Sequence, residues 1–165
     1  MKKVLFLILF ILLIAKGGFA MKITSPEFKH NEMIPKKFTC QGEDVSPTLL
    51  ISDIPVNAKS LVLIVDDPDA PIGNWDHWIV YNIMPQTSRI EEGSIPGKQA
   101  LNDFNRGDWG GPCPPSGTHR YFFKIYALNK ILTLDENSRK SDVESAMSGC
   151  IIDQAQMIGL YKKTF

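Results

Sequence analysis

The run His119–Leu128, "HRYFFKIYAL", is apolar or aromatic at most positions and predicts a central β-strand that is covered on both faces. Two other runs have the same character, "SLVLIVDD" at Ser60–Asp67 and "HWIVYNIM" at His77–Met84. The segments Thr48–Pro55 and Lys22–Phe28 are more polar and predict weaker or edge strands. Prolines separate one extended segment from the next. Most of the chain is therefore predicted to be β-structure.

The last part of the chain changes its hydrophobic period. In "SDVESAMSGCIIDQAQMIGLYKK", residues 141–163, apolar side chains recur at helical spacing. Ser141 is placed to cap a helix, and Glu144 three residues later completes a capping box. We predict one C-terminal helix packed on the sheets, with an interruption allowed near Gly149. Many short strands and one late helix indicate a mainly β fold, a Greek-key β-sandwich with short helices and a C-terminal helix.

Residues 1–20 have the composition of a secretory signal peptide. A lysine-rich start precedes the uncharged apolar run Val4–Ala15, and Gly18 and Ala20 are the small residues that a signal peptidase accepts. The run is shorter than the ~20 residues that a transmembrane helix needs. We expect cleavage before Met21, one domain over residues 21–165, and export to the periplasm or the medium. An uncleaved anchor and a true start at Met21 are the alternatives.

The charge balance bears on the class of partner. Residues 21–165 hold 15 basic and 18 acidic side chains, a net charge near −3. A weakly acidic chain does not favour nucleic acid, which attracts basic surfaces. No histidine pair has the i, i+4 spacing of a helical metal motif, so neither a metal nor another cofactor is expected.

Three cysteines are present, and two of them lie in loops rich in glycine and proline. Cys40 is in "FTCQGEDVSP" and Cys113 is in "GPCPPSG". An exported protein meets an oxidising compartment, so we expect these two to pair, with the fully reduced state as the alternative. Cys150 is expected to be buried and free.

A loop rich in proline and glycine precedes the predicted strand His119–Leu128. Gly110–Tyr121, "GGPCPPSGTHRY", combines three prolines with three glycines. Side chains alternate along a strand, so His119 and Tyr121 share one face, where an imidazole and a phenol can both donate hydrogen bonds. Rigid loop amides beside two donors suit an anion such as phosphate, sulfate or carboxylate. A structural strand histidine satisfied by its neighbours fits the same pattern.

Two earlier motifs allow a structural or a functional interpretation. "DDPDAP" at Asp66–Pro71 closes a strand with three acidic residues, and Asp-Pro commonly opens a turn. "WDHW" at Trp75–Trp78 places His77 near two indoles. That histidine can fill the core, or it can donate into a pocket with aromatic walls.

Taken in order, these three motifs resemble the phosphatidylethanolamine-binding protein family, and most of all its bacterial and archaeal Raf-kinase-inhibitor-like branch. The resemblance implies a pocket for small anions and phospho-headgroups. The residues that match the family pocket are Asp67, His77, Gly111, Pro112, His119 and Tyr121. By the same match Asp69 orients a turn, Trp78 supplies an apolar wall, and Arg120 faces the other way to pair with an acid.

The resemblance implies a binding protein rather than an enzyme, because hydrogen bonding to an anion needs no turnover. A serine-protease inhibitor presenting the proline-rich loop is the first alternative, and a hydrolase using histidine and aspartate is the second. Cys113 and the two prolines after it match the prokaryotic branch, so kinase inhibition is not transferred. A homodimer is a further expectation from the family.

Overall fold

The computed structural model describes residues 20–164, so the predicted signal peptide lies outside the described residues except for Ala20. The elements, in chain order, are β1 (Lys22–Thr24), β2 (Glu32–Met33), the 3-10 turn η1 (Lys36–Phe38), β3 (Leu49–Ser52), β4 (Ser60–Asp67), β5 (Trp75–Ile83), β6 (Arg89–Ile90), β7 (Lys98–Ala100), β8 (Thr118–Leu128), α1 (Lys140–Met147) and β9 (Ile151–Lys162). No helix within residues 20–164 has the length and apolar character needed to span a bilayer.

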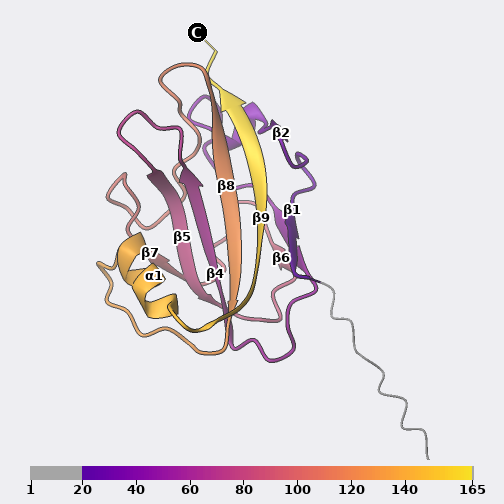
Figure 1. Ribbon diagram of the computed structural model, residues 1–165. Helices are drawn as coiled ribbons and strands as arrows, with labels where there is room; N and C mark the ends of the chain where they lie inside the picture. The colour runs from indigo at the N-terminus through magenta and orange to yellow at the C-terminus, as the bar shows by residue number, and fades with distance from the viewer. Residues whose placement is uncertain (1–19, 165) are drawn as a thin grey trace, which may run out of the picture.

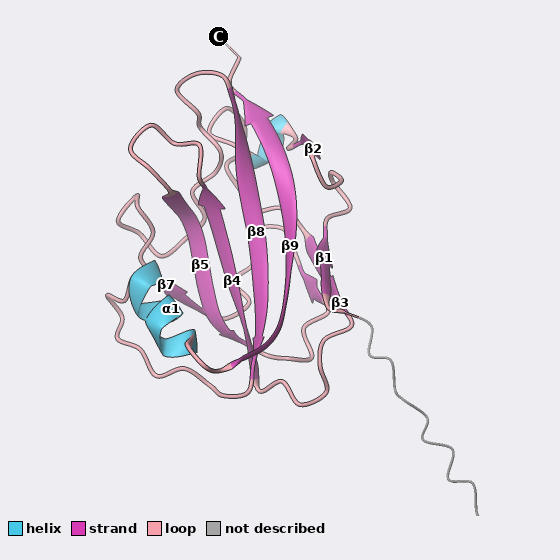
Figure 2. Cartoon of the chain, in the orientation of Figure 1, coloured by secondary structure: helices cyan, strands magenta, loops and turns pink. Residues whose placement is uncertain are grey.

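Within residues 20–164, two sheets and one α-helix make up the architecture (Figure 1). The large sheet has the order β2-β9-β8-β4-β5-β7 and the small sheet has the order β1-β3-β6. The expected mainly β fold is confirmed. Figure 2 shows α1 as a short helix beside β5 and β7, away from the small sheet.

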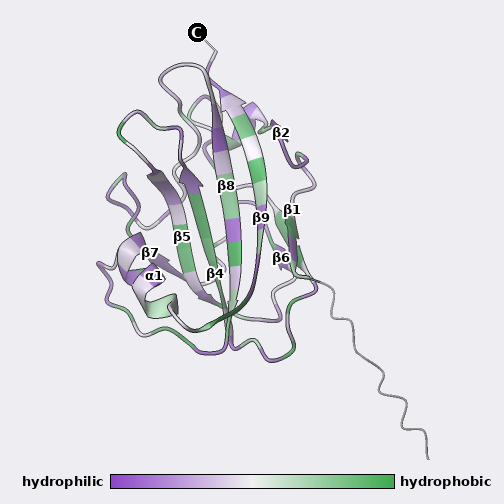
Figure 3. Ribbon diagram, viewed as in Figure 1, coloured by the Kyte–Doolittle hydropathy of each residue, from purple (hydrophilic) through white to green (hydrophobic). Residues whose placement is uncertain are grey.

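The three apolar runs form the centre of the large sheet, as predicted. β8 pairs antiparallel with both β4 and β9, and β4 also pairs with β5. Every residue of β4 is buried, and β4 is apolar along most of its length in Figure 3. Its alternate side chains enter two different clusters, Leu63 on one face and Ile64 on the other.

The larger cluster fills the space between the sheets. Ile23 and Ile51 of the small sheet pack there with Leu63 and Phe123 of the large sheet. The smaller cluster joins α1 to the opposite face, where Val143 and Met147 of the helix meet Ile79 and Tyr81 of β5. A sheet covered on both faces explains why its central strands read as continuous apolar runs.

The predicted long C-terminal helix is wrong in its second half. The helix ends at Met147, and residues 151–162 form β9, which pairs with β8 along nearly its whole length. Met157, Gly159 and Tyr161 are buried in alternation, which is the period of a strand. The short helical stretch before β9 made the apolar spacing look helical throughout.

The helix start also differs from the prediction. The carboxylate of Asp142 accepts the backbone N–H of Arg139 at 2.8 Å, so the cap lies two residues before Ser141. Cys150 is free, as predicted, but it is only half-buried.

Candidate functional site

A cavity of about 300 Å³ opens where β4 ends and where β5 and β8 begin. Four polar side chains line it, and we call them the polar floor: Asp67, His77, His119 and Tyr121. Apolar side chains line the rest of the cavity, and we call the following six the apolar mouth: Pro71, Ile72, Trp75, Phe104, Pro114 and Pro115. Three separate strands therefore bring polar groups to one hollow.

His119 and Asp67 form a buried pair across β8 and β4. Nδ1 of His119 lies 2.7 Å from Oδ2 of Asp67, and both side chains are less than one tenth exposed. A carboxylate can only accept, so Nδ1 carries the hydrogen. The second oxygen of Asp67 accepts the backbone N–H of Asp69 at 2.8 Å. With Nδ1 occupied, Nε2 is the ring nitrogen left to serve a ligand.

His77 reaches the cavity because of a β-bulge. The pairing of β4 with β5 passes from Val65–Trp78 directly to Asp66–Asp76, so His77 has no partner residue on β4. A bulge re-aims side chains and commonly occurs beside functional sites. The carbonyl oxygen of His77 instead accepts the backbone N–H of Gly110 at 3.2 Å.

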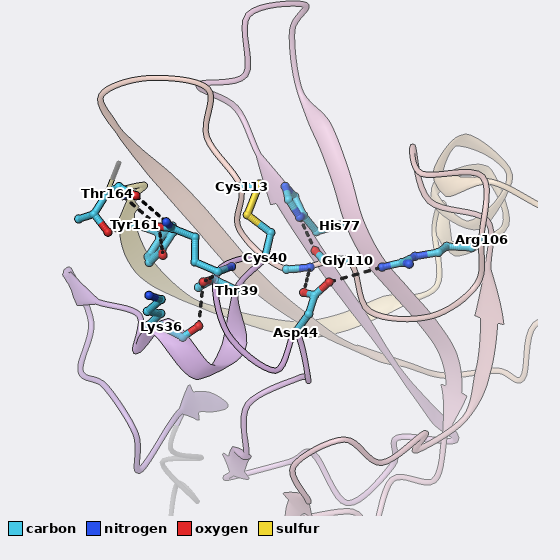
Figure 4. The surroundings of a disulfide bond; sticks show 12 residues. Lys36, Thr39, Cys40, Asp44, His77, Arg106, Gly110, Cys113, Tyr161 and Thr164 are labelled. Carbon is cyan, nitrogen blue, oxygen red and sulfur yellow. Dashed lines mark hydrogen bonds and ion pairs between the residues drawn. A yellow bond between two sulfur atoms is a disulfide. The ribbon is translucent and has the colours of Figure 1, made fainter.

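The ring of His77 is held between a carbonyl group and two aromatic rings. Its Nδ1 donates to the carbonyl oxygen of Gly110 at 2.5 Å (Figure 4). Tyr121 and Phe104 meet the ring edge-on, with centroids 5.2 and 5.5 Å away. Burial lowers the pKa of His77, which favours the neutral ring.

Tyr121 has a buried hydroxyl group that meets no partner at good hydrogen-bond geometry in the described chain, although the Asp67 carboxylate and the Cys113 backbone lie close enough to affect its pKa. The side chain is 1 % exposed and belongs to the core as well as to the cavity wall. Burial raises the phenol pKa above its ordinary value, and the nearby negative charge of Asp67 raises it further. The group therefore stays an O–H donor at neutral pH.

A disulfide anchors the proline-rich loop to the segment after η1. Cys40 and Cys113 are joined, as predicted, with their Cα atoms 5.5 Å apart (Figure 4). Cys113 lines the cavity and precedes Pro114 and Pro115, which are part of the apolar mouth. The crosslink thus holds one wall of the cavity in place.

The relationship of this chain to a known family follows from its sequence match. The model of the family described as "phosphatidylethanolamine-binding protein" matches residues 24–162. The chain belongs to the phosphatidylethanolamine-binding protein family.

Relatives of known sequence or structure agree. A protein of Aquifex aeolicus is 48 % identical over 160 residues, covering 92 % of this chain and 94 % of its own. The crystal structure of a phosphatidylethanolamine-binding protein homologue from Chlamydia trachomatis has a TM-score of 0.86 at 46 % identity, over 88 % of this chain and 99 % of its own. The structure of Escherichia coli YbcL gives 0.81 at 30 % identity, over 88 % and 100 %. These matches support the assignment of this chain to the bacterial and archaeal branch of the family.

Gly111 and Pro112, which the phosphatidylethanolamine-binding protein motif places at the pocket, do not line the cavity. Their backbones instead hold neighbouring loops together. The backbone N–H of Gly111 donates to Oδ1 of Asp44 at 2.8 Å, and the carbonyl of Pro112 accepts from the backbone N–H of Cys40 at 3.2 Å. A side chain at Gly111 would put its Cβ 2.2 Å from that Asp44 oxygen, so only glycine fits.

Asp69 and Trp78, the other two residues expected from the family match, do not line the cavity. Asp69 pairs with Arg120 through two hydrogen bonds of 2.7 and 2.8 Å, which lower the pKa of Asp69 to about 2. This is the acid partner predicted for Arg120. Trp78 is 1 % exposed and packs edge-on against Trp109 in the inter-sheet core.

Sequence reasoning missed Ile72, Trp75 and Phe104 of the apolar mouth. Trp75, two positions before His77, supplies the indole that was expected from Trp78. Phe104 comes from a loop and contacts Trp75 edge-on at 5.4 Å. Strand alternation would have placed Trp75 and His77 on one face, whereas nothing local signals Phe104.

The described residues contain no group of three or more His, Cys, Asp and Glu side chains arranged to hold a metal ion. The two pocket histidines use Nδ1 for Asp67 and for the Gly110 carbonyl. The donor set is that of a hydrogen-bonding pocket.

Proposed function

We propose that this protein binds a small anion, such as phosphate or the phosphate of a phospholipid headgroup, without chemical turnover. The observation that supports it best is the hydroxyl of Tyr121, which is buried beside two imidazoles and has no partner among residues 20–164. Leaving such a group unsatisfied costs about 1–3 kcal/mol. A ligand oxygen that reaches this hydroxyl from the cavity would remove that cost.

The two imidazoles complement a partly protonated anion. Nε2 of His119 donates to the anion when that ring carries two protons, and Nε2 of His77 accepts while its ring is neutral. Hydrogen phosphate can serve both, because it has free oxygens and an O–H group.

Export is part of the proposal. The Cys40–Cys113 disulfide is formed between two exposed residues, and such bonds persist in oxidising compartments. The composition of residues 1–20 points to the same location. Fractionation of cells expressing the full chain tests it: the protein is expected outside the cytoplasm, and a wholly cytoplasmic, full-length product would contradict export.

Calorimetric titration of inorganic phosphate at pH 6 tests the binding function. Tyr121→Phe is expected to weaken binding about 10- to 100-fold, since a hydrogen bond to a charged group contributes about 1.5–3 kcal/mol. Its melting temperature should stay level or rise, because the lost hydroxyl has no partner. Tyr126→Phe, the same change on the other face of β8, is the control and should bind normally. A wild-type protein that binds no phosphate would refute the proposal.

A serine-protease inhibitor is a second candidate. Residues 115–117 are all exposed and lie between the disulfide at Cys113 and the start of β8, which gives a rigid, accessible segment. Stoichiometric loss of trypsin, chymotrypsin or elastase activity, retained in Tyr121→Phe, would favour this function over anion binding. Unchanged protease activity would remove it.

A hydrolase is the enzyme alternative. The Asp67–His119 pair has the arrangement of an orienting carboxylate and a general base. Ser116, the nearest serine in the loop sequence, does not line the cavity. Release of product from a chromogenic ester that disappears in His119→Ala would support this candidate, and no release by the wild type would remove it.

A further inference from the structure

We infer that the end of the large sheet opposite the cavity is a docking surface for an anionic lipid bilayer. Four exposed apolar side chains and two lysines form it, and we call it the basal surface: Val56, Met84, Ile131, Ile151, Lys59 and Lys130. This surface plays no part in the proposed anion binding, and the inference does not depend on that function.

The four central strands of the large sheet reach the basal surface together (Figure 1). β4 and β9 begin there, whereas β5 and β8 end there. Leu128, the last residue of β8, pairs with Ser60 of β4 on one side and with Ile151 of β9 on the other. The cavity lies at the other end of β8, which has 11 residues and spans about 35 Å. The two sites are therefore separate.

The segment after β8 crosses the strand ends at the basal surface. The carbonyl oxygen of Lys130 accepts from the hydroxyl of Ser60 at 2.5 Å, at the start of β4. The backbone N–H of Leu132 donates to the side-chain oxygen of Asn82 at 2.8 Å, near the end of β5. Ile131 lies between these two contacts, so it joins the apolar side chains that flank it on neighbouring strand ends.

The four apolar side chains of the basal surface face solvent. Val56 is fully exposed, and Met84, Ile131 and Ile151 are 68, 66 and 42 % exposed. None of the four belongs to the two buried clusters of the core. Single exposed aliphatic residues are ordinary, but four on adjacent strand ends form a patch that gains free energy by leaving water.

The charge at this end favours an anionic partner. Lys59 and Lys130 are exposed, and neither forms an ion pair within residues 20–164. The carboxylate of Asp53, in the loop that carries Val56, already lies 3.9 Å from Nζ of Lys22. Aliphatic side chains beside free lysines suit the interface of an anionic bilayer, where each lysine adds attraction.

The start of the chain leaves the domain beside the basal surface. The backbone N–H of Met21 donates to Oδ2 of Asp153 at 3.0 Å, two residues after Ile151. The apolar run Val4–Ala15 ends six residues before Met21, and six residues span at most about 20 Å. A leader of this composition enters a membrane, so it holds this end of the domain close to the bilayer while it is attached. That proximity favours lipid over protein as the occupant.

Vesicle sedimentation tests the inference on residues 21–165, which include every described strand and helix. We expect the protein to sediment with vesicles of phosphatidylglycerol and phosphatidylcholine in equal parts. It should sediment less with phosphatidylcholine alone, and less when sodium chloride is raised, because salt screens the lysines. Inorganic phosphate should release no more protein than chloride at the same ionic strength, since the cavity faces away from the bilayer.

Variants assign the binding to the basal surface. Replacing its four apolar residues by serine should lower vesicle affinity at least tenfold, and Lys59→Gln with Lys130→Gln should lower it about tenfold on the acidic vesicles alone. These side chains are exposed, so both variants should melt close to the wild type. Met33→Ser is the control, because Met33 is 50 % exposed and pairs with β9 near its other end.

Cys150 provides a direct probe of this surface. It is free, it precedes Ile151, and its carbonyl oxygen accepts the backbone N–H of Asn129 at 3.0 Å. A polarity-sensitive fluorophore on Cys150 should brighten and shift to the blue with the acidic vesicles. The same fluorophore on Met33→Cys, in a Cys150→Ser background, should not respond.

Four results would overturn the inference and leave anion binding standing. They are a wild type that does not sediment with acidic vesicles, a serine variant that still sediments fully, release by phosphate beyond that by chloride, and a response of the fluorophore at Met33→Cys alone. Analytical ultracentrifugation covers the remaining occupant. A dimer that the serine substitutions abolish, without vesicle binding, would assign this surface to a second copy of the chain instead.

Discussion

Replacing Cys40 and Cys113 together by serine should lower stability more than any single surface change. The disulfide joins residues 73 positions apart, and closing a loop of that length removes about 4.5 kcal/mol of conformational entropy from the unfolded chain. A domain of about 145 residues unfolds with an entropy near 0.3 kcal/mol/K, so the melting temperature should fall by up to about 15 °C. Both cysteines are exposed, so the serines bury no new polar group.

Thermal unfolding followed by circular dichroism measures the effect. Cys150→Ser is the matched control, since Cys150 is free and half-buried, and it should melt close to the wild type. Adding a reductant to the wild type should reproduce the loss and leave the double variant unchanged. A double variant that melts within about 2 °C of the control would show that the crosslink does not constrain the unfolded chain as reasoned here.

Three further predictions concern charge and packing. Burial lowers the pKa of His77 below 6.5, so below about pH 6.5 the unfolded state binds more protons than the folded state and stability falls as the pH drops. His77→Asn should therefore flatten the dependence of melting temperature on pH between pH 8 and 5. Arg120→Ala should return the Asp69 pKa from about 2 toward 3.8, measurable by NMR titration, and a value that stays near 2 would contradict the assigned cause. Gly159→Ala should cost about 1–3 kcal/mol in denaturant unfolding, because the added Cβ would lie 2.5 Å from Ile34 Cγ1, and an unchanged midpoint would refute that packing.

The central strands could be predicted because they carry a signal of composition. β4, β5 and β8 are long, apolar and rich in β-branched and aromatic residues. Their two faces pack into two different hydrophobic clusters, so both faces are apolar. The C-terminal strand could not be predicted in the same way. One face of β9 packs on the inter-sheet core and the other mixes Gln154 and Gln156 with Ile158 and Leu160, so the apolar residues of β9 fit a helical spacing as well as a strand.

The candidate site was predictable as a set of residues but not in its details. Ordered motifs brought Asp67, His77, His119 and Tyr121 together, and the structure places all four in one cavity. The bulge that aims His77 depends on the register between two strands, which no local pattern shows. The hydrogen bond from the backbone N–H of Gly111 to Asp44, 67 residues away in the chain, likewise depends on tertiary contact alone.

NMR of the histidine side-chain nitrogens, recorded with and without phosphate at pH 6.5, tests the central claim most directly. His30, whose Nδ1 accepts the backbone N–H of Ile158 far from the cavity lining, is the internal control. The account predicts that saturating phosphate shifts the Nε2 resonances of His77 and His119, keeps hydrogens on both Nδ1 atoms, and leaves His30 unchanged. Saturable phosphate binding that shifts only His30, or none of the three, would contradict it.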